Sequence, residues 1–152
     1  MPMFEKIINY FKEQNWRYTE LNKKKVAIFG ISGENGNFQC VADVNENEFK
    51  FIFFSICGSN APIEKRGLLS ELITHLNMGL FFGNFEMDFE DGEIRFKTSI
   101  FFKNIDISKD VIEYAIMVNI ISMDKALPAL TEVMYGNKSL LEAMELIKEI
   151  EN

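Results

Sequence analysis

The sequence is poor in the residues from which metal centres, disulfide frameworks and nucleophilic sites are built. It has two cysteines, Cys40 and Cys57, and a single histidine, His75. Two cysteines are too few for a disulfide framework, and both lie inside apolar strand patterns, where a reduced and buried thiol is expected. A zinc site usually needs several His or Cys ligands. We therefore expect no metal and no cofactor.

An excess of basic residues and a long uninterrupted apolar segment are also missing. The formal net charge is −7, which argues against nucleic acid and anionic membrane surfaces as partners because both attract Lys/Arg patches. The one basic run, Lys23–Lys25, is interpreted as a solvated turn. The first residues lack the layout of a signal peptide, and Glu113, Asn119 and Asp124 interrupt the longest apolar patterns. We expect a cytoplasmic, reduced location.

Phenylalanine and methionine are unusually abundant, with 15 and 8 residues. A Phe-rich core explains this most simply, and a Phe-lined binding face is the alternative. The overall balance of 47% hydrophobic and 26% charged residues is that of a globular protein. A chain of 152 residues is about one domain long, so residues 1–152 are interpreted as a single domain.

Hydrophobic periodicity predicts an α+β fold, an antiparallel sheet with flanking helices in the order α-β-β-β-β-α-β-β-α-α. Strand 48–57 has apolar residues on both faces, which predicts a central strand covered on two sides. Ser139 and Glu142 have capping-box spacing and begin the last helix. The expected elements are helix 2–15, strands 16–21, 26–32, 38–44 and 48–57, helix 62–77, a hairpin around 91–92, helix 108–135 and helix 139–150.

The hairpin has a register that can be worked out. Asp91-Gly92 is the strongest short hairpin signal, because both central residues of a type I′ turn need positive φ. A two-residue loop places Phe89 opposite Ile94 and Asp88 opposite Arg95, with acidic residues facing basic ones on the outer side. The acids of this segment are interpreted as a solvated face and not as a metal site, since the EF-hand spacing is absent. They are Glu86, Asp88, Glu90, Asp91 and Glu93.

Catalytic motifs are absent. Gly30, Gly33 and Gly36 loosely resemble a phosphate loop, but such loops lead into a helix and these glycines lead into a strand, which favours a turn. His75 is interpreted as a residue near a helix end, and nothing in the sequence points to a Cys-His nucleophilic pair. No Gly-x-Ser-x-Gly element occurs. We therefore expect no catalytic, cofactor-binding or metal-binding residues.

The helix after Ser108 is apolar around much of its circumference, which predicts burial on most sides. Its second covering is either the tail helix of the same chain or another subunit. Asn119 interrupts the apolar stripe and is interpreted as a hydrogen-bonded buried amide. A surface that one thin α+β layer does not hide is typical of an interaction site, and a two-fold homodimer is its commonest closure.

Several short motifs together carry a family resemblance, mainly in the C-terminal half. They are Leu76-Asn77, Gly83-Asn84-Phe85, the Asp91-Gly92 hairpin, Met123-Asp124 and Pro128. In order and spacing they resemble the YbjN family, described as bacterial sensory transduction regulators. Ala126 departs from the pattern, where an aromatic residue is expected. The family is similar in element order to type III secretion chaperones, which implies a small α+β domain, often a homodimer, that binds a partner segment and catalyses nothing.

The leading functional hypothesis is a non-enzymatic protein-binding module, chaperone-like or regulatory, that binds a partner segment through an apolar groove or a strand edge. The alternative is a small-molecule sensor, or an enzyme without a recognisable motif, that uses a pocket between helices and sheet. An enclosed pocket with converging polar groups would favour the alternative. A shallow apolar patch beside a two-fold axis would favour the first.

Overall fold

The computed structural model describes residues 1–21 and 23–151, with side chains up to residue 148. It confirms the α+β class and the predicted element order. A single antiparallel sheet has the strand order β1-β2-β3-β4-β6-β5. The elements are α1 Met3–Glu13, β1 Thr19–Glu20, β2 Val26–Ser32, β3 Asn37–Asn45, β4 Lys50–Ile56, the 3₁₀ turn η1 Ile63–Lys65, α2 Arg66–Met78, β5 Asn84–Met87, β6 Ile94–Phe101, α3 Lys109–Tyr135 and α4 Leu140–Glu151.

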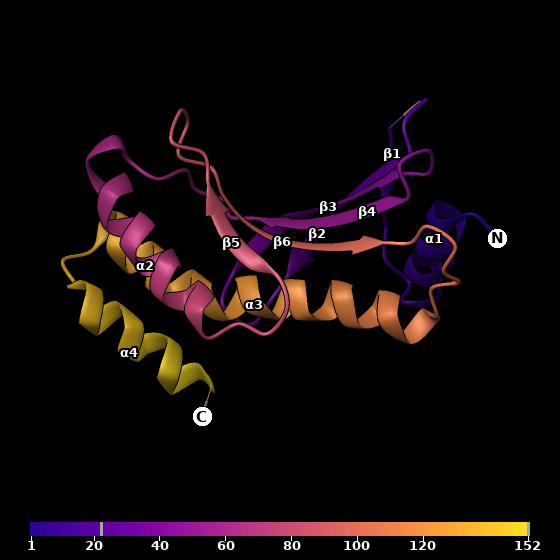
Figure 1. The fold of residues 1–152 in the computed structure, drawn as a ribbon. Coiled ribbons are helices and arrows are strands. Elements are labelled where there is room, and N and C mark those ends of the chain that lie inside the picture. The colour runs from indigo at the N-terminus through magenta and orange to yellow at the C-terminus, as the bar shows by residue number, and fades with distance from the viewer. Residues whose placement is uncertain (22, 152) are drawn as a thin grey trace.

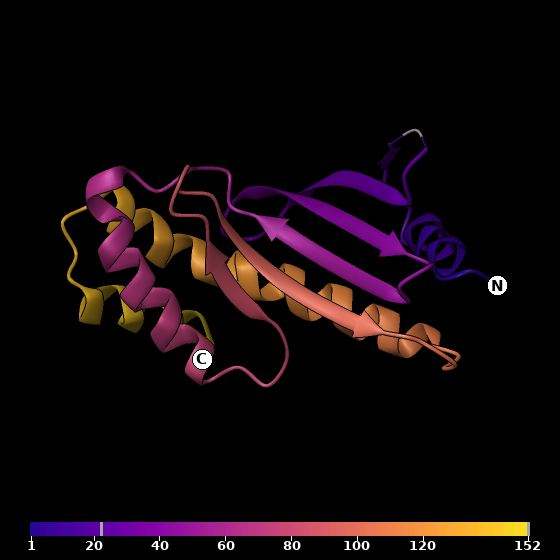
Figure 2. The same ribbon diagram turned by 45° about the horizontal axis from the view of Figure 1, so that its top comes forward.

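The helices lie on one side of the sheet (Figure 1, Figure 2). The long helix α3 runs under β4 and β6, and α1 packs at its N-terminal end. Helices α2 and α4 lie at the other end of α3, beside the edge strand β5. On α1, apolar residues at helical spacing face the core, where Ile7 and Phe11 are completely buried.

The strands alternate between a covered and an open face. On β4, Phe51 and Phe53 are buried beneath the helices, whereas Ile52, Phe54 and Ile56 point to the other face and are half-buried. The prediction that β4 is central is confirmed, because it lies between β3 and β6. The prediction that it is covered on both sides is wrong, because no helix of the described chain lies on the second face (Figure 1).

The first strand is shorter than the predicted range 16–21 and holds only Thr19–Glu20. The residues before it are fixed by side-chain packing instead of by strand pairing. Trp16 stacks on Phe29 with 5.0 Å between ring centroids and meets Tyr10 edge-on at 5.7 Å. The aromatic contacts therefore draw the chain onto the covered face before it reaches the ladder.

The predicted hairpin register is wrong by two residues. The structure pairs Met87 with Ile94 and Glu86 with Arg95, so Phe89 is not opposite Ile94 and is exposed in the loop. Because side chains alternate with a period of two, a shift of two residues keeps every remaining side chain on its predicted face. The core face of the hairpin is therefore still apolar, as expected.

Side-chain chemistry of the loop explains the shift. The carboxylates of Asp88 and Asp91 each accept a hydrogen bond from the backbone two residues on, at 2.8 Å in both cases. Such Asx turns stabilise a wider loop than the two-residue turn predicted from Asp91-Gly92. Within the loop between β5 and β6, only Gly92 takes a positive φ, of 81°. The guanidinium of Arg66 then donates to the carbonyl of Phe89 at 2.8 Å and holds the loop from outside.

The signals at the ends of the two last helices are confirmed. α3 ends at Tyr135, directly before Gly136. The Ser139 hydroxyl accepts from the Glu142 amide at 3.3 Å, and the Glu142 carboxylate accepts from the Ser139 amide at 3.2 Å. This reciprocal capping begins α4 at the predicted position and turns the chain back along α3.

Candidate interaction surfaces and pockets

The tail helix covers only part of α3. With a rise of 1.5 Å per residue, the 27 residues of α3 are about 40 Å long and the 12 residues of α4 about 18 Å. α4 runs back from Gly136, and its residue Ile147 lies in the same pocket as Ala126 of α3. The first half of α3, before Ile121, therefore lies beyond the reach of α4, and Ile121 stands at the boundary because it lines that pocket too. The tail helix accounts for part of the predicted covering and leaves the rest open.

Large apolar side chains are exposed along this uncovered half. Val111, Tyr114 and Ile121 of α3 are 44%, 48% and 46% exposed. Met78 and Phe81, at the end of α2 and in the connection to β5, are 85% and 93% exposed. We call these five residues the α3 strip. Exposed apolar residues that gather in one place are typical of interaction sites.

Two contacts show that the parts of the α3 strip are neighbours. The ring of Phe82, next to Phe81, packs on Tyr114 with 5.7 Å between centroids. Leu80 and Ile121 line the same pocket. The α2–β5 connection therefore lies against α3 between Tyr114 and Ile121, and it presents Phe81 to solvent at that place. Tyr114, Ile121 and the connection that carries Phe81 therefore lie close together across two elements.

The open face of the sheet is a second apolar surface. Ile28, Val41 and Phe54 form a row across β2, β3 and β4 and are half-buried by one another. The guanidinium of Arg95 lies over the ring of Phe54 at 4.6 Å and shields it further. This face therefore exposes less of each side chain than the α3 strip does.

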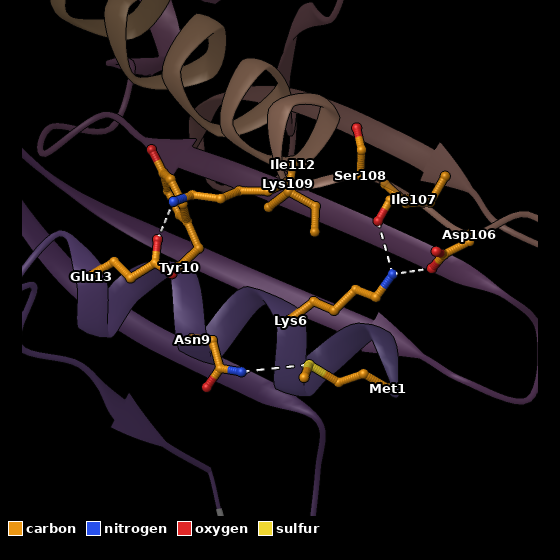
Figure 3. Close-up of a pocket in the computed structure, with 10 residues that line it drawn as sticks. All are labelled: Met1, Lys6, Asn9, Tyr10, Glu13, Asp106, Ile107, Ser108, Lys109 and Ile112. Carbon is orange, nitrogen blue, oxygen red and sulfur yellow. Dashed lines mark hydrogen bonds and ion pairs between the residues drawn. The ribbon is translucent and has the colours of Figure 1, made fainter.

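A pocket of ≈ 330 Å³, lined by four charged side chains among others, lies between α1 and the start of α3. Figure 3 shows that its charged side chains point toward one another. Lys6 pairs with Asp106, and Lys109 pairs with Glu13. The hydrogen bond from Lys6 lowers the pKa of Asp106, and the hydrogen bond to Glu13 raises the pKa of Lys109. Each of these four side-chain charges therefore has a partner within the same pocket.

Tyr10 lines this pocket, and the pKa of its hydroxyl is the most strongly shifted there. Burial, and then the nearby Glu113 carboxylate, raise the pKa of its hydroxyl to about 12. A phenol with this pKa holds its proton throughout the neutral range, so it does not act as a general base.

A different pocket, of ≈ 400 Å³, lies between α2, α3 and α4. Its floor and walls are mainly apolar, and its polar groups are basic or neutral. His75 lies in the last turn of α2, as predicted, and is exposed at the rim. We call this site the α2–α3–α4 pocket. Its lining residues are His75, Leu76, Gly79, Leu80, Phe85, Ile121, Ser122, Lys125, Ala126, Met144, Ile147 and Lys148.

The two cysteines are placed as inert core residues. Cys40 is completely buried, and its burial raises the thiol pKa to about 12. Burial also raises the pKa of Cys57. Neither lines the pocket that contains His75. A nucleophilic cysteine needs an accessible thiolate, which these environments oppose. Within the described part of the chain, no three His, Cys, Asp or Glu residues are grouped so that they could hold a metal ion.

The sequence model of one protein family, with the description "Putative bacterial sensory transduction regulator", matches residues 4–132. The chain belongs to the YbjN family. The resemblance drawn from the short motifs is thereby confirmed, and it extends into the N-terminal half as well. No curated protein matches the chain. Over the described residues, no helix combines the length and the apolar character that a membrane crossing requires.

Asn77, a YbjN-like motif residue, holds the edge strand β5. Its side-chain amide donates to the carbonyl of Phe85 at 3.1 Å, and its oxygen accepts from the amide of Phe85 at 2.8 Å. These two bonds satisfy both backbone groups of Phe85 on the outer edge of the sheet. An edge strand satisfied in this way is protected against pairing with another chain.

Asp124, from the Met123-Asp124 motif, holds the turn between β2 and β3. Its carboxylate accepts from the backbone amides of Glu34 at 3.2 Å and Asn35 at 2.9 Å. A Cβ at Gly33 would lie 2.1 Å from the Asp124 carboxylate, so only glycine permits this approach. The interpretation as turn residues agrees with the positions of Gly33 and Gly36 between β2 and β3, but it is wrong for Gly30, which lies inside β2.

The remaining motif positions are also structural. Gly83 has a φ of +84°, and a Cβ there would lie 2.5 Å from the ring of Phe96. α3 continues through Pro128, and Met123 is fully buried in the core. Ala126, which stands where an aromatic residue is expected, lies at the floor of the α2–α3–α4 pocket. The motifs maintain the fold, and the small side chain of Ala126 leaves space in the pocket.

Sequence reasoning missed the most exposed residues of the α3 strip, Met78 and Phe81. The signal for Phe81 is the apolar run Leu80–Phe82 between Gly79 and Gly83, and Met78 directly precedes this run as the last residue of α2. A short apolar run between two glycines forms a loop, and a loop of this length cannot bury every side chain. Lys125 was missed too, because its importance comes from its place at a pocket assembled by three separate helices.

Proposed function

We propose that this YbjN-family chain is a non-enzymatic regulatory module that binds a segment of a partner protein on the α3 strip. The observation that carries the proposal is the exposure of five large apolar side chains on α3 and on the end of α2 with its connection to β5. Two of them, Phe81 and Tyr114, are aromatic, and aromatic side chains are frequent energetic anchors of interfaces. The family description as a sensory transduction regulator agrees with such a role.

A surface contact is a better account than addition of a strand to the sheet. At one edge of the sheet, Asn77 already satisfies the outer backbone groups of Phe85. At the other edge, β1 has only two residues and pairs with Ala27 and Ile28, so an added strand would find only the short remainder of β2, Phe29–Ser32, beyond it. Strand addition depends on a run of free main-chain groups for its affinity. The apolar α3 strip needs no such groups.

We also propose that the whole chain acts as one domain and forms a homodimer, through the α3 strip or through the open face of the sheet. A two-fold interface buries the same patch on both copies and is the commonest closure for an exposed apolar surface. Light scattering at micromolar concentration tests this, and twice the monomer mass is expected. A monomeric mass would contradict the dimer while leaving the α3 strip free for a partner.

An affinity pull-down with mass spectrometry tests the binding function. The bait is the full chain as wild type, as the double variant Phe81→Ser/Tyr114→Ser, and as the control Ile63→Ser. Ile63 is 78% exposed and lies in η1, outside the α3 strip. We expect a protein that is retained by the wild type and the control and lost by the double variant. A partner retained equally by all three baits would contradict the proposed site.

A further inference from the structure

The α2–α3–α4 pocket combines an apolar interior with a basic rim. Phe85 and Ala126 are buried at its inner end, and Leu76, Leu80, Met144 and Ile147 contribute further apolar surface. Three helices bound it, so it is a concave site and not a flat patch. Its volume of ≈ 400 Å³ lies within the range of small-molecule sites, about 300–1,000 Å³.

The charges of the pocket are opposite to those of the chain. Asp and Glu outnumber Lys and Arg by 23 to 16 in the sequence. The pocket nevertheless contains Lys125, Lys148 and His75, and none of its described lining residues is acidic. Lys148 has an exposed partner in Glu145 at 3.1 Å, a contact that solvent screens. Lys125 forms no ion pair with any described residue.

The pocket between α1 and the start of α3 differs in how its lysines are paired. There, Lys6 and Lys109 are each neutralised by an acid of the same pocket. Here, half-buried Lys125 stands beside apolar surface and forms no ion pair with a described side chain, although it also lines a neighbouring pocket that contains Glu34 and Asp124. A charge at the edge of an apolar cavity attracts a group of opposite charge more strongly than one in open solvent. The pocket is therefore complementary to a molecule with an apolar body and one negative charge.

We propose that the α2–α3–α4 pocket binds an aliphatic monocarboxylate, with the carboxylate beside Lys125 and the hydrocarbon chain against Phe85 and Ala126. A single negative charge fits better than a phosphate. Phosphate sites commonly use the free amides at the N-terminus of a helix, whereas His75 and Gly79 bring the C-terminal end of α2 to this pocket. The partial negative charge of that helix end opposes a multiply charged anion.

The ligand would connect α4 to the rest of the fold. Met144 and Ile147 of α4 form one wall, and Leu76 and Leu80 at the end of α2 form another. A hydrocarbon chain between the walls adds contacts that the unliganded protein lacks. Because Ile121 belongs to both the pocket and the α3 strip, occupancy also reaches the proposed partner surface. The ligand site would thus lie next to the proposed partner-binding surface, and the inference extends the proposed function.

Isothermal titration calorimetry with sodium decanoate below its micelle concentration tests the site. The proteins are the wild type, Lys125→Met, and the control Lys138→Met, whose lysine is exposed in the α3–α4 connection. We expect saturable binding of one decanoate per chain, an affinity at least roughly tenfold lower for Lys125→Met, as expected for loss of about 1.4 kcal/mol, and no change for the control. Decan-1-ol, which lacks the charge, should bind the wild type as weakly as decanoate binds Lys125→Met.

Two further measurements keep the outcome decisive. Hydrogen exchange should slow in α4 when decanoate is present, because the ligand contacts Met144 and Ile147. The variant Phe81→Ser/Tyr114→Ser should bind decanoate like the wild type, which separates this site from the proposed partner surface. Absence of saturable binding, equal affinity for decanoate and decan-1-ol, or an unchanged affinity of Lys125→Met would each overturn the proposal.

Discussion

Asn119 is the polar group on which the position of α3 over the sheet most depends. It is completely buried, and its side-chain nitrogen donates to the carbonyl of Phe53 at 2.8 Å, to the carbonyl of Phe96 at 3.1 Å and to the hydroxyl of Thr98 at 3.2 Å. The two N–H groups thus connect the helix to both β4 and β6. The side-chain oxygen has no hydrogen-bond partner within the described structure.

The substitution Asn119→Asp keeps the shape and removes the donors. In its ionised form the new carboxylate would face two backbone carbonyls, with no described cation beside it. An uncompensated buried charge destabilises a protein by about 3–5 kcal/mol. In its protonated form the carboxyl donates one hydrogen bond in place of two N–H groups, so the loss falls to about 1–2 kcal/mol.

The difference between the two forms makes the stability loss depend on pH. Burial raises the pKa of the new carboxyl in the folded state above its value of about 3.9 in the unfolded chain. Below the unfolded pKa both states are protonated, and no pH-dependent loss exists. As the pH rises above that value, the unfolded state releases its proton first, and the variant loses stability until the pH passes the folded pKa.

Urea unfolding followed by the fluorescence of Trp16 measures this effect. We expect Asn119→Asp to lose about 1–2 kcal/mol relative to the wild type near pH 4 and about 3–5 kcal/mol at pH 8. The control Asn137→Asp changes an exposed amide in the α3–α4 connection and should show a difference near zero at both values. Parallel pH profiles for the two Asn-to-Asp variants would refute the role assigned to the buried amide.

Three further predictions concern the motif residues and the thiols. Asn77→Ala should lower the free energy of unfolding by about 1–3 kcal/mol, and amide exchange should speed up in β5 more than in β3; unchanged exchange in β5 would contradict its role. Gly33→Ala should destabilise the wild type more than it destabilises the Asp124→Ala variant, because the new Cβ meets the Asp124 carboxylate only in the wild type. Additive effects of the two substitutions in a thermodynamic cycle would count against this contact. Cys40 and Cys57 should resist thiol reagents at pH 8 until the protein unfolds, since burial raises both pKa values; rapid labelling of the native protein would show that one is accessible.

Local sequence signals predicted the elements because their causes are local. Periodicity placed β2 at residues 26–32 with the bounds that the structure has. Gly136 and the Ser139–Glu142 pair marked the break between the last helices because helix ends are satisfied by nearby residues. The family motifs were also recognised in the sequence, and the structure explains them by hydrogen bonds and close approaches.

The features that sequence reasoning missed depend on tertiary structure. The hairpin register was wrong because the carboxylates of Asp88 and Asp91 and the distant Arg66 stabilise a wider loop. The open face beside Phe54 and the exposed half of α3 depend on where the helices end. A periodic pattern shows that a face is apolar, but it does not show what covers it. The same holds for Lys125, whose surroundings come from three helices.

The central claim is that the α3 strip binds the partner segment. It is tested most directly by calorimetry with a partner obtained from the pull-down, titrated into the wild type, Phe81→Ser/Tyr114→Ser and Ile63→Ser. Truncation of interface anchors commonly costs 2 kcal/mol or more, so the account predicts binding weaker by at least roughly 30-fold for the double variant and unchanged for Ile63→Ser. Equal affinity for all three proteins would contradict it.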